Sequence, residues 1–227
     1  MSFTALGLSS PLAEASSDLG FSEPTPIQAG VIPEVLAGKD VLGIAKTGSG
    51  KTASYVLPIL QKATSAKHRE PEVLVLVPTR ELADQVRQVF EQFLPALPER
   101  LRCLAIFGGV AINPQMQEVG KADIIVATPG RLLDLVSKNA LTLSAVKTLV
   151  LDEADKMLNL GFKKEVDALI ALLPTLPIPD DGSSKVLTAP KGETALQELQ
   201  TQARYLFPIF GVLHLPLLWG ILYLSRS

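Results

Sequence analysis

A glycine-rich loop near the start of the chain has the residue types that bind phosphate. Residues 45–52 read Ala-Lys-Thr-Gly-Ser-Gly-Lys-Thr and lie between an apolar run and a segment with helical character. Glycines let backbone N–H groups turn toward an anion, and the following helix adds its positive N-terminal end. We expect Lys51 to reach the β- and γ-phosphates and Thr52 to ligate Mg²⁺. The expected nucleotide contacts are Thr47, Gly48, Ser49, Gly50, Lys51 and Thr52.

The loop departs from the general phosphate-loop pattern at one position, where Ala45 replaces the first glycine. Taken alone, the segment has an alternative interpretation as a Gly/Ser-rich loop with a chance lysine. A second motif argues against that alternative.

The acidic segment Asp152-Glu153-Ala154-Asp155 directly follows an apolar run, about one hundred residues after the loop. A carboxylate at the tip of a strand beside a phosphate loop can hold Mg²⁺, usually through water, and its neighbour can deprotonate an attacking water. We assign the metal role to Asp152 and the general-base role to Glu153. The alternative is an acidic helix N-terminus, where carboxylates favour the helix dipole. Pairing with the phosphate loop favours the catalytic interpretation.

Short apolar runs alternate with longer helical patterns, which predicts an α/β fold with a mostly parallel sheet and helices on both faces. The predicted strands are 41–45, 73–77, 102–107, 123–127 and 147–151. The predicted helices are 25–37, 51–66, 80–94, 112–120, 129–138 and 163–173. In such sheets, ligands bind at the carboxyl ends of the strands, where both motifs lie.

Composition limits the functional classes. The 227 residues are 47% hydrophobic and carry a formal net charge of −2, so bulk charge gives no sign of nucleic-acid binding. Any such binding must come from a local basic patch. The single cysteine, Cys103, excludes an internal disulfide and favours a reducing compartment, so we expect the cytoplasm.

Taken together, the motifs resemble those of the N-terminal RecA-like lobe of a DEAD-box ATP-dependent RNA helicase, a P-loop NTPase fold. The resemblance covers residues 3 to about 173, in family order. Its segments are Gly20-Phe21, Pro24-Thr25-Pro26-Ile27-Gln28, the phosphate loop, 78–83, Gly108-Gly109, Thr128-Pro129-Gly130-Arg131 and Asp152-Glu153-Ala154-Asp155.

The resemblance implies ATP as the nucleotide, with Mg²⁺. Gln28 would hydrogen-bond the adenine edge, and Phe3 would stack on or near the base. The alternatives are simple packing of the N-terminal segment for Phe3 and a surface position for Gln28. Asp155 would couple ATP hydrolysis to RNA work.

The resemblance also implies contacts with the backbone of single-stranded RNA, in which sequence is not read. Glycines would allow close approach, and arginines would grip phosphate oxygens. The alternatives are turns for the glycines, solvated helix starts for the arginines and an N-cap for Thr128. The residues are Pro78, Thr79, Arg80, Gly109, Thr128, Gly130 and Arg131.

Two departures from the family pattern concern coupling. The family's Ser-Ala-Thr motif is missing, and the nearest segment, 187–190, reads Leu-Thr-Ala-Pro. Motifs of the family's second RecA-like lobe, which supplies arginines to the γ-phosphate, are also missing. We therefore expect RNA remodelling only with a second lobe, and a RecA-like lobe supplied in trans is one candidate partner. The alternative is a truncated, non-catalytic fragment that binds nucleotide and RNA.

The chain changes character after about residue 175. We divide it into an adenine-recognition segment (1–28), an ATP-binding lobe (29–190) and an atypical hydrophobic tail (191–227). The nearly uncharged stretch 205–224 is long enough to cross a bilayer, which leaves a membrane-tethered lobe as an alternative. Because prolines and glycines interrupt this stretch, we expect an aberrant end and no membrane partner.

Overall fold

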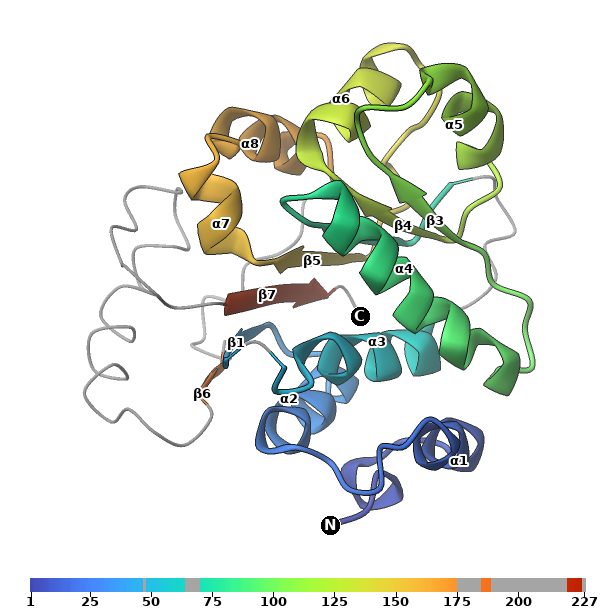
Figure 1. The fold of residues 1–227 in the computed structure, drawn as a ribbon, viewed down its shortest axis with the longest axis vertical. Coiled ribbons are helices and arrows are strands. Elements are labelled where there is room, and N and C mark those ends of the chain that lie inside the picture. Colours follow the sequence, from blue (N-terminus) through green and yellow to red (C-terminus); the bar gives the residue numbers. More distant parts are fainter. Residues whose placement is uncertain (47, 64–69, 175–184, 189–219, 226–227) are drawn as a thin grey trace.

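One seven-stranded sheet organises the molecule (Figure 1). A computed structural model describes residues 1–46, 48–63, 70–174, 185–188 and 220–225. The strands are β1 (Val41–Ile44), β2 (Val73–Leu76), β3 (Cys103–Ile106), β4 (Ile124–Ala127), β5 (Thr148–Asp152), β6 (Lys185–Thr188) and β7 (Gly220–Ser225). Their order across the sheet is β3-β4-β2-β5-β7-β1-β6.

The sheet is mostly parallel, as predicted. Strands β3, β4, β2 and β5 are adjacent in that order and each pair is parallel. Strand β1 is parallel to β6. Strand β7 lies between β5 and β1 and is antiparallel to both, so β1 and β5 share one direction. The carboxyl ends of β1 to β5 therefore lie along the same edge of the sheet, where ligands collect in folds of this class.

Helices follow most of the strands. They are α1 (Ser10–Asp18), α2 (Pro26–Leu36), α3 (Lys51–Lys62), α4 (Arg80–Phe93), α5 (Ile112–Val119), α6 (Pro129–Ser137), α7 (Ala154–Asn159) and α8 (Lys163–Ala171). Two single-turn 3₁₀ helices occupy Thr4–Leu6 and Leu94–Ala96. Each of the six predicted helices is present, whereas α1 and α7 were not predicted.

Successive strand residues point to opposite faces of the sheet, and apolar residues on both faces are buried under helices. In β2, Val73 and Val75 belong to a core shared with α1 to α4. Leu74 and Leu76 belong to a second core, shared with α5 to α8. The prediction of an α/β fold with helices on both faces is confirmed.

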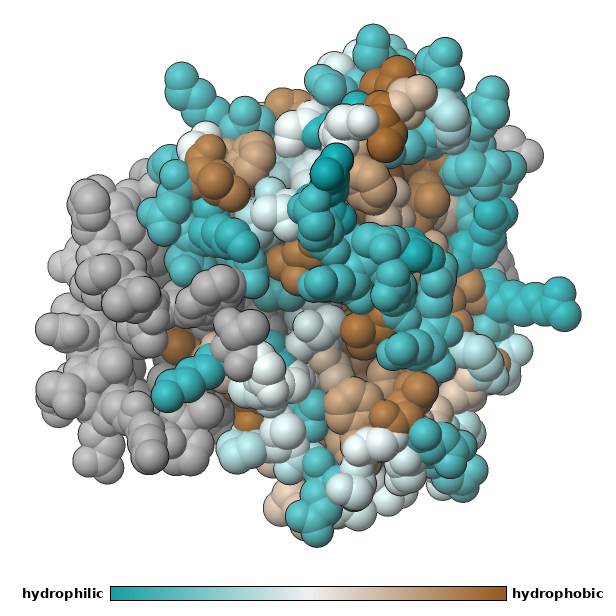
Figure 2. Space-filling view, viewed as in Figure 1, coloured by the Kyte–Doolittle hydropathy of each residue, from teal (hydrophilic) through white to brown (hydrophobic). Residues whose placement is uncertain are grey.

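Helix α4 shows how the sequence builds one of these layers. Its buried residues Ala83, Val86, Phe90 and Phe93 recur at intervals of three and four, which places them on one side of the helix. The other side is hydrophilic, and the view in Figure 2 is mostly hydrophilic over this helix. Thr79 is the N-cap of α4, and its Oγ1 accepts the N–H of Leu82 at 3.2 Å.

The N-terminal segment packs onto α3 through one side chain. Gln61 donates its Nε2 hydrogen to Gly7 O at 2.8 Å, and its Oε1 accepts the N–H of Ser9 at 2.7 Å. Leu12 on α1 is fully buried in the core that α3 also joins. The first residues of the chain are thereby fixed against the helix that follows the phosphate loop.

Part of the predicted hydrophobic tail lies in the sheet. Residues 220–225 form β7, which pairs with β1 from Val41↔Tyr223 to Ile44↔Gly220 and with β5 from Thr148↔Ser225 to Asp152↔Ile221. Residues 205–219 lie outside the described residues, so the prediction of an aberrant end stays a prediction there. Within the described part of the chain, every helix is too short or too polar to span a membrane.

Candidate functional site

The phosphate loop joins β1 to α3 and depends on two glycines in left-handed backbone conformations. Gly48 has φ +78° and Gly50 has φ +87°, a region that side chains disfavour. A Cβ on Gly50 would lie 2.6 Å from Gln28 Nε2, closer than real Cβ atoms approach a neighbouring atom. The loop thus brings backbone and helix N-terminus together, as a phosphate site requires. Thr47 lies outside the described residues.

Lys51 is the first residue of α3 and bends back over the loop. Its Nζ donates to Ala45 O at 2.5 Å and to Lys46 O at 2.9 Å. Burial lowers the pKa of this ammonium, while the carboxylates of Asp152, Glu153 and Asp155 act in the opposite direction. The structure therefore brings the predicted phosphate lysine and the predicted acidic motif into one site.

The acidic motif begins where β5 ends. Asp152 is the last residue of the strand and Ala154 the first of α7, so Glu153 makes the turn between them. It does so with φ +52° and ψ +45°, a strained conformation for a long side chain. Such strain is found where function requires a particular side-chain direction. Glu153 Oε2 lies 3.3 Å from Lys156 Nζ.

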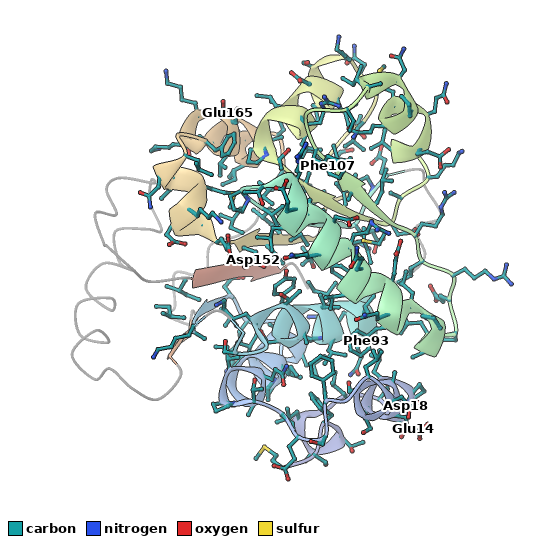
Figure 3. The ribbon with its side chains drawn as sticks, in the orientation of Figure 1. Glu14, Asp18, Phe93, Phe107, Asp152 and Glu165 are labelled. Carbon is teal, nitrogen blue, oxygen red and sulfur yellow. The ribbon has the colours of Figure 1, made fainter. Side chains whose placement is uncertain are left out.

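Asp152 is buried, with 3% of its surface exposed. Figure 3 shows it at the end of β5, in the middle of the molecule. Its Oδ2 accepts a hydrogen bond from the Tyr55 hydroxyl at 2.9 Å. Burial raises the pKa of Asp152 to about 6, although the Tyr55 hydrogen bond and the Lys51 charge oppose that rise. A cation at this site would offset the cost of burying the ionised carboxylate.

Polar atoms around the loop fit a magnesium–nucleotide complex. Among the described residues, Ser49 Oγ and Asp155 Oδ1 are buried without a hydrogen-bond partner. No group of three metal-ligating side chains occurs in this part of the chain. Mg²⁺ is usually bound through one or two protein oxygens plus the phosphates of a substrate. Thr52 and Asp152 remain the predicted protein ligands.

Gln28 and Phe3, the predicted adenine contacts, lie in different surroundings. Gln28 is fully buried, so the surface alternative is wrong; its Nε2 donates to Gly50 O at 3.2 Å and its Oε1 accepts from Thr25 N at 2.9 Å. Phe3 is 3% exposed and belongs to the core beneath α2 and α3. The structure therefore favours packing for Phe3 and links Gln28 directly to the phosphate loop.

The predicted RNA contacts gather at the carboxyl ends of β2, β4 and β3, which are neighbours in the sheet. Arg80, after β2, is exposed and lies near Gly109, since a Cβ on that glycine would be 3.6 Å from Arg80 Nη1. Arg131, after β4, donates from Nη2 to Val110 O at 3.0 Å. The structure brings these residues onto one surface.

The remaining predicted RNA contacts divide between buried and available groups. Pro78 is buried, and the Thr79 hydroxyl accepts the N–H of Leu82. Thr128 precedes α6 but its side chain makes no capping hydrogen bond, so the N-cap alternative does not account for it. Gly130 lies in the first turn of α6 with open space where a Cβ would be.

Asp155 lies in the first turn of α7, half-buried beside Lys51. The segment that comes nearest to the missing Ser-Ala-Thr motif is 187–190, and its described residues do not lie beside the acidic motif in the sheet. Thr188 ends β6, which pairs with β1, so both β1 and β7 separate it from β5. Ala189 and Pro190 lie outside the described residues. In this sheet order, the segment that most resembles the missing coupling motif is not a neighbour of the acidic motif.

Comparison with known proteins agrees with this geometry. A family model described as DEAD/DEAH box helicase matches residues 25–196, most of the chain. The chain belongs to this family. The matched range contains the phosphate loop, the acidic motif and every predicted RNA contact, so the DEAD-box resemblance is confirmed.

Individual DEAD-box proteins show the extent of the similarity. The chain is 45% identical over 173 residues to the ATP-dependent RNA helicase DeaD of Escherichia coli, covering 76% of this chain and 27% of that protein. It is 46% identical over 174 residues to the DEAD-box ATP-dependent RNA helicase CshA of Bacillus cereus, covering 76% and 32%. The chain thus spans about a third or less of these relatives.

A solved structure supports the fold. The crystal structure of a DEAD box protein from the hyperthermophile Methanococcus jannaschii superposes with a TM-score of 0.75 at 33% identity. The alignment covers 91% of this chain and 63% of that one. The RecA-like α/β architecture predicted from the sequence is confirmed.

Two residues that sequence reasoning missed hold the site together. Tyr55 bonds Asp152, and Gln115 joins the loop after β3 to Arg131. Gln115 Nε2 donates to Phe107 O at 3.1 Å, and its Oε1 accepts from Arg131 Nη1 at 3.2 Å. The spacing of Tyr55 from Lys51 is a signal for the first; nothing in the sequence signals the second.

Proposed function

We propose that this chain is the ATP- and RNA-binding lobe of an ATP-dependent RNA helicase. The observation that supports it is the meeting of three groups at one sheet edge: the phosphate loop after β1, the acidic motif after β5, and the basic surface at the ends of β2 to β4. Nucleotide and RNA would then bind side by side on one rigid sheet. We also propose a cytoplasmic location.

Each part of the site has a role in this proposal. Lys51 leaves the carbonyls of Ala45 and Lys46 to pair with phosphate oxygens. Thr52 and Asp152 hold Mg²⁺, directly or through water, and the ion would offset charge on the phosphates. Glu153 orients the attacking water and takes its proton. Gln28 reads the adenine edge from its place beside Gly50.

The RNA side of the proposal uses backbone contacts. Arg80 and Arg131 supply charge and planar donors for phosphate oxygens, and Gly109 and Gly130 leave room for the strand to approach. Thr128 offers a free hydroxyl in the same region. Since these groups would contact phosphate and sugar atoms, which are the same for every nucleotide, binding should tolerate any sequence.

Nucleotide binding tests the proposal through Lys51→Ala. Loss of a charge-assisted hydrogen bond to phosphate should lower affinity for a fluorescent ATP analogue with Mg²⁺ about 10- to 100-fold, in line with roughly 1.5–3 kcal/mol for such bonds. Lys62→Ala removes the same side chain from the other end of α3, where it bonds Val35 O, and should bind as wild type. Equal affinity for all three proteins would contradict the phosphate-site assignment.

Hydrolysis coupled to RNA remodelling requires more than this lobe in our proposal, because the γ-phosphate charge is stabilised by arginines of a second RecA-like lobe. Phosphate release should therefore be slow for the chain alone with single-stranded RNA. It should rise when a second lobe is added in trans, and Glu153→Gln should abolish the rise. Release that the second lobe leaves unchanged would favour the non-catalytic fragment instead.

A further inference from the structure

Tyr55 connects two parts of the site that are far apart in sequence. It lies on α3 with no exposed surface, and its hydroxyl donates to Asp152 Oδ2 at 2.9 Å across a separation of 97 residues. The helix that begins at the phosphate loop is thereby joined to the strand that carries the acidic motif. Neither the family match nor the motifs assign this residue a role.

The position of Tyr55 on the helix is not arbitrary. It follows Lys51 by four residues and Thr52 by three, so the three side chains lie on neighbouring positions of one helix face. One face of α3 therefore carries Lys51, which is proposed to bind phosphate, and Thr52, which is proposed to ligate Mg²⁺. The same face carries Tyr55, whose hydroxyl donates to Asp152.

The hydrogen bond from Tyr55 can fix the orientation of the Asp152 carboxylate. The terminal torsion of an aspartate is soft, with broad wells, so the carboxylate needs a fixed partner to hold one plane. The Tyr55 ring supplies one, because it is enclosed in the apolar core with Val56, Val75 and Val150. A phenol is also neutral, so it orients the carboxylate and leaves the negative charge for a cation. A lysine or arginine at this place would neutralise that charge.

We propose that Tyr55 is a positioning residue for the metal carboxylate: it holds Asp152 by Oδ2 so that the remaining oxygen lone pairs serve Mg²⁺ or its water ligands. This inference rests on the proposed function, since it concerns the same site. Tyr55 touches neither nucleotide nor metal in this proposal and acts through Asp152. Partners of this kind commonly change metal affinity about 10- to 100-fold when removed.

The test is Tyr55→Phe in the full chain, with a fluorescent non-hydrolysable ATP analogue as the probe. Binding is measured in EDTA and then across a Mg²⁺ titration. We expect the Mg²⁺ midpoint to rise about tenfold, while affinity for the analogue in EDTA stays within about twofold of wild type. A purely structural role would lower both affinities together. A wild-type Mg²⁺ midpoint in Tyr55→Phe would overturn the inference.

Two comparisons sharpen the result. Ser16→Ala removes another fully buried hydroxyl, which bonds Leu12 O at 2.8 Å in α1, and should leave the Mg²⁺ midpoint unchanged. In an Asp152→Asn background, Tyr55→Phe should add no further shift, because its effect passes through that carboxylate. Additive shifts would overturn the inference. Wild-type chain that binds the analogue without any Mg²⁺ dependence would instead overturn the proposed magnesium site.

A measurement on the native fold covers the case in which Tyr55→Phe unfolds. The chain with 3-fluorotyrosine at its three tyrosines is followed by fluorine NMR, and the Tyr55 signal is the one that persists in Tyr205→Phe/Tyr223→Phe. We expect this signal to move when Mg²⁺ is added to the analogue complex. A signal that Mg²⁺ does not move would overturn the inference.

Discussion

Gly50 is the residue at which the phosphate loop and the adenine-recognition segment meet. Gly50 is the N-cap of α3, with φ +87°. Its carbonyl oxygen accepts a hydrogen bond from Gln28 Nε2 at 3.2 Å. The lack of a side chain matters twice, because a Cβ would strain the backbone and would press on Gln28. One position therefore links the phosphate loop to Gln28, the side chain proposed to read the adenine edge.

We predict that Gly50→Ala lowers affinity for the ATP analogue at least about tenfold and costs roughly 1–3 kcal/mol of unfolding free energy, from backbone strain and displacement of Gln28. Gly161→Ala is the control, since Gly161 has φ +85° but nothing within 4 Å of its Cβ position. It should show the strain in urea unfolding without the binding loss. Equal binding losses would mean that the contact with Gln28 is unimportant.

The candidate side chains of the site could be named from the sequence where a short local pattern indicates the chemistry. Lys51, Thr52, Asp152 and Glu153 follow from a loop and an acidic segment that each occupy a few consecutive residues. Tyr55 was not predicted, because its partner is 97 residues away and the hydrogen bond exists only once α3 packs against β5. The candidate reacting groups can be predicted from residue types in a local pattern. The groups that orient them depend on tertiary packing, which the local pattern does not contain.

At the scale of the element, the basic surface formed by Arg80 and Arg131 lies where strands β2 and β4 end. Arg80 follows β2 at the carboxyl edge of the sheet, whereas Arg102 precedes β3 at the opposite edge. Both side chains are more than half exposed, and each is paired with a glutamate, Glu81 or Glu118. They differ chiefly in which edge they occupy, so they make a matched pair for testing the surface.

We predict that Arg80→Ala weakens single-stranded RNA binding and makes the slope of log affinity against log salt shallower by about 0.7, the value for one phosphate contact on a single strand. Arg102→Ala should leave both quantities unchanged. Fluorescence anisotropy with a labelled oligonucleotide over a salt series measures them. Equal effects of the two changes would contradict a surface confined to the carboxyl ends.

Element prediction was best where hydrophobic periodicity is strong. Helix α4 alternates buried and polar positions along its length and was predicted within a residue at each end. Helix α1 was missed because its sequence, Ser-Pro-Leu-Ala-Glu-Ala-Ser-Ser-Asp, has few large apolar residues, and its burial comes from packing. The Pro near its start was an available signal, since proline favours the first helical turn.

At the scale of the whole molecule, the sheet joins segments from opposite ends of the chain. Strand β7 lies between β1 and β5, so residues 220–225 separate the strand before the phosphate loop from the strand before the acidic motif. The sequence did not reveal this, because an apolar run of this kind is equally consistent with a strand, a buried helix or a membrane segment. Residues 220–225 form a strand because they fill the position between β1 and β5 in the sheet.

A strand with neighbours on both sides offers a direct test, because every backbone N–H along it points to one partner or the other. We predict that Leu222→Pro lowers the unfolding free energy by at least about 2 kcal/mol, through a lost ladder hydrogen bond and an unsatisfied buried carbonyl. Leu222→Val keeps the N–H and a strand-forming side chain, so it should lose much less. Urea denaturation of both variants measures the difference. Equal stabilities would place residues 220–225 outside the sheet in solution, and β1 and β5 would then need another strand between them to hold the loop and the acidic motif at their present spacing.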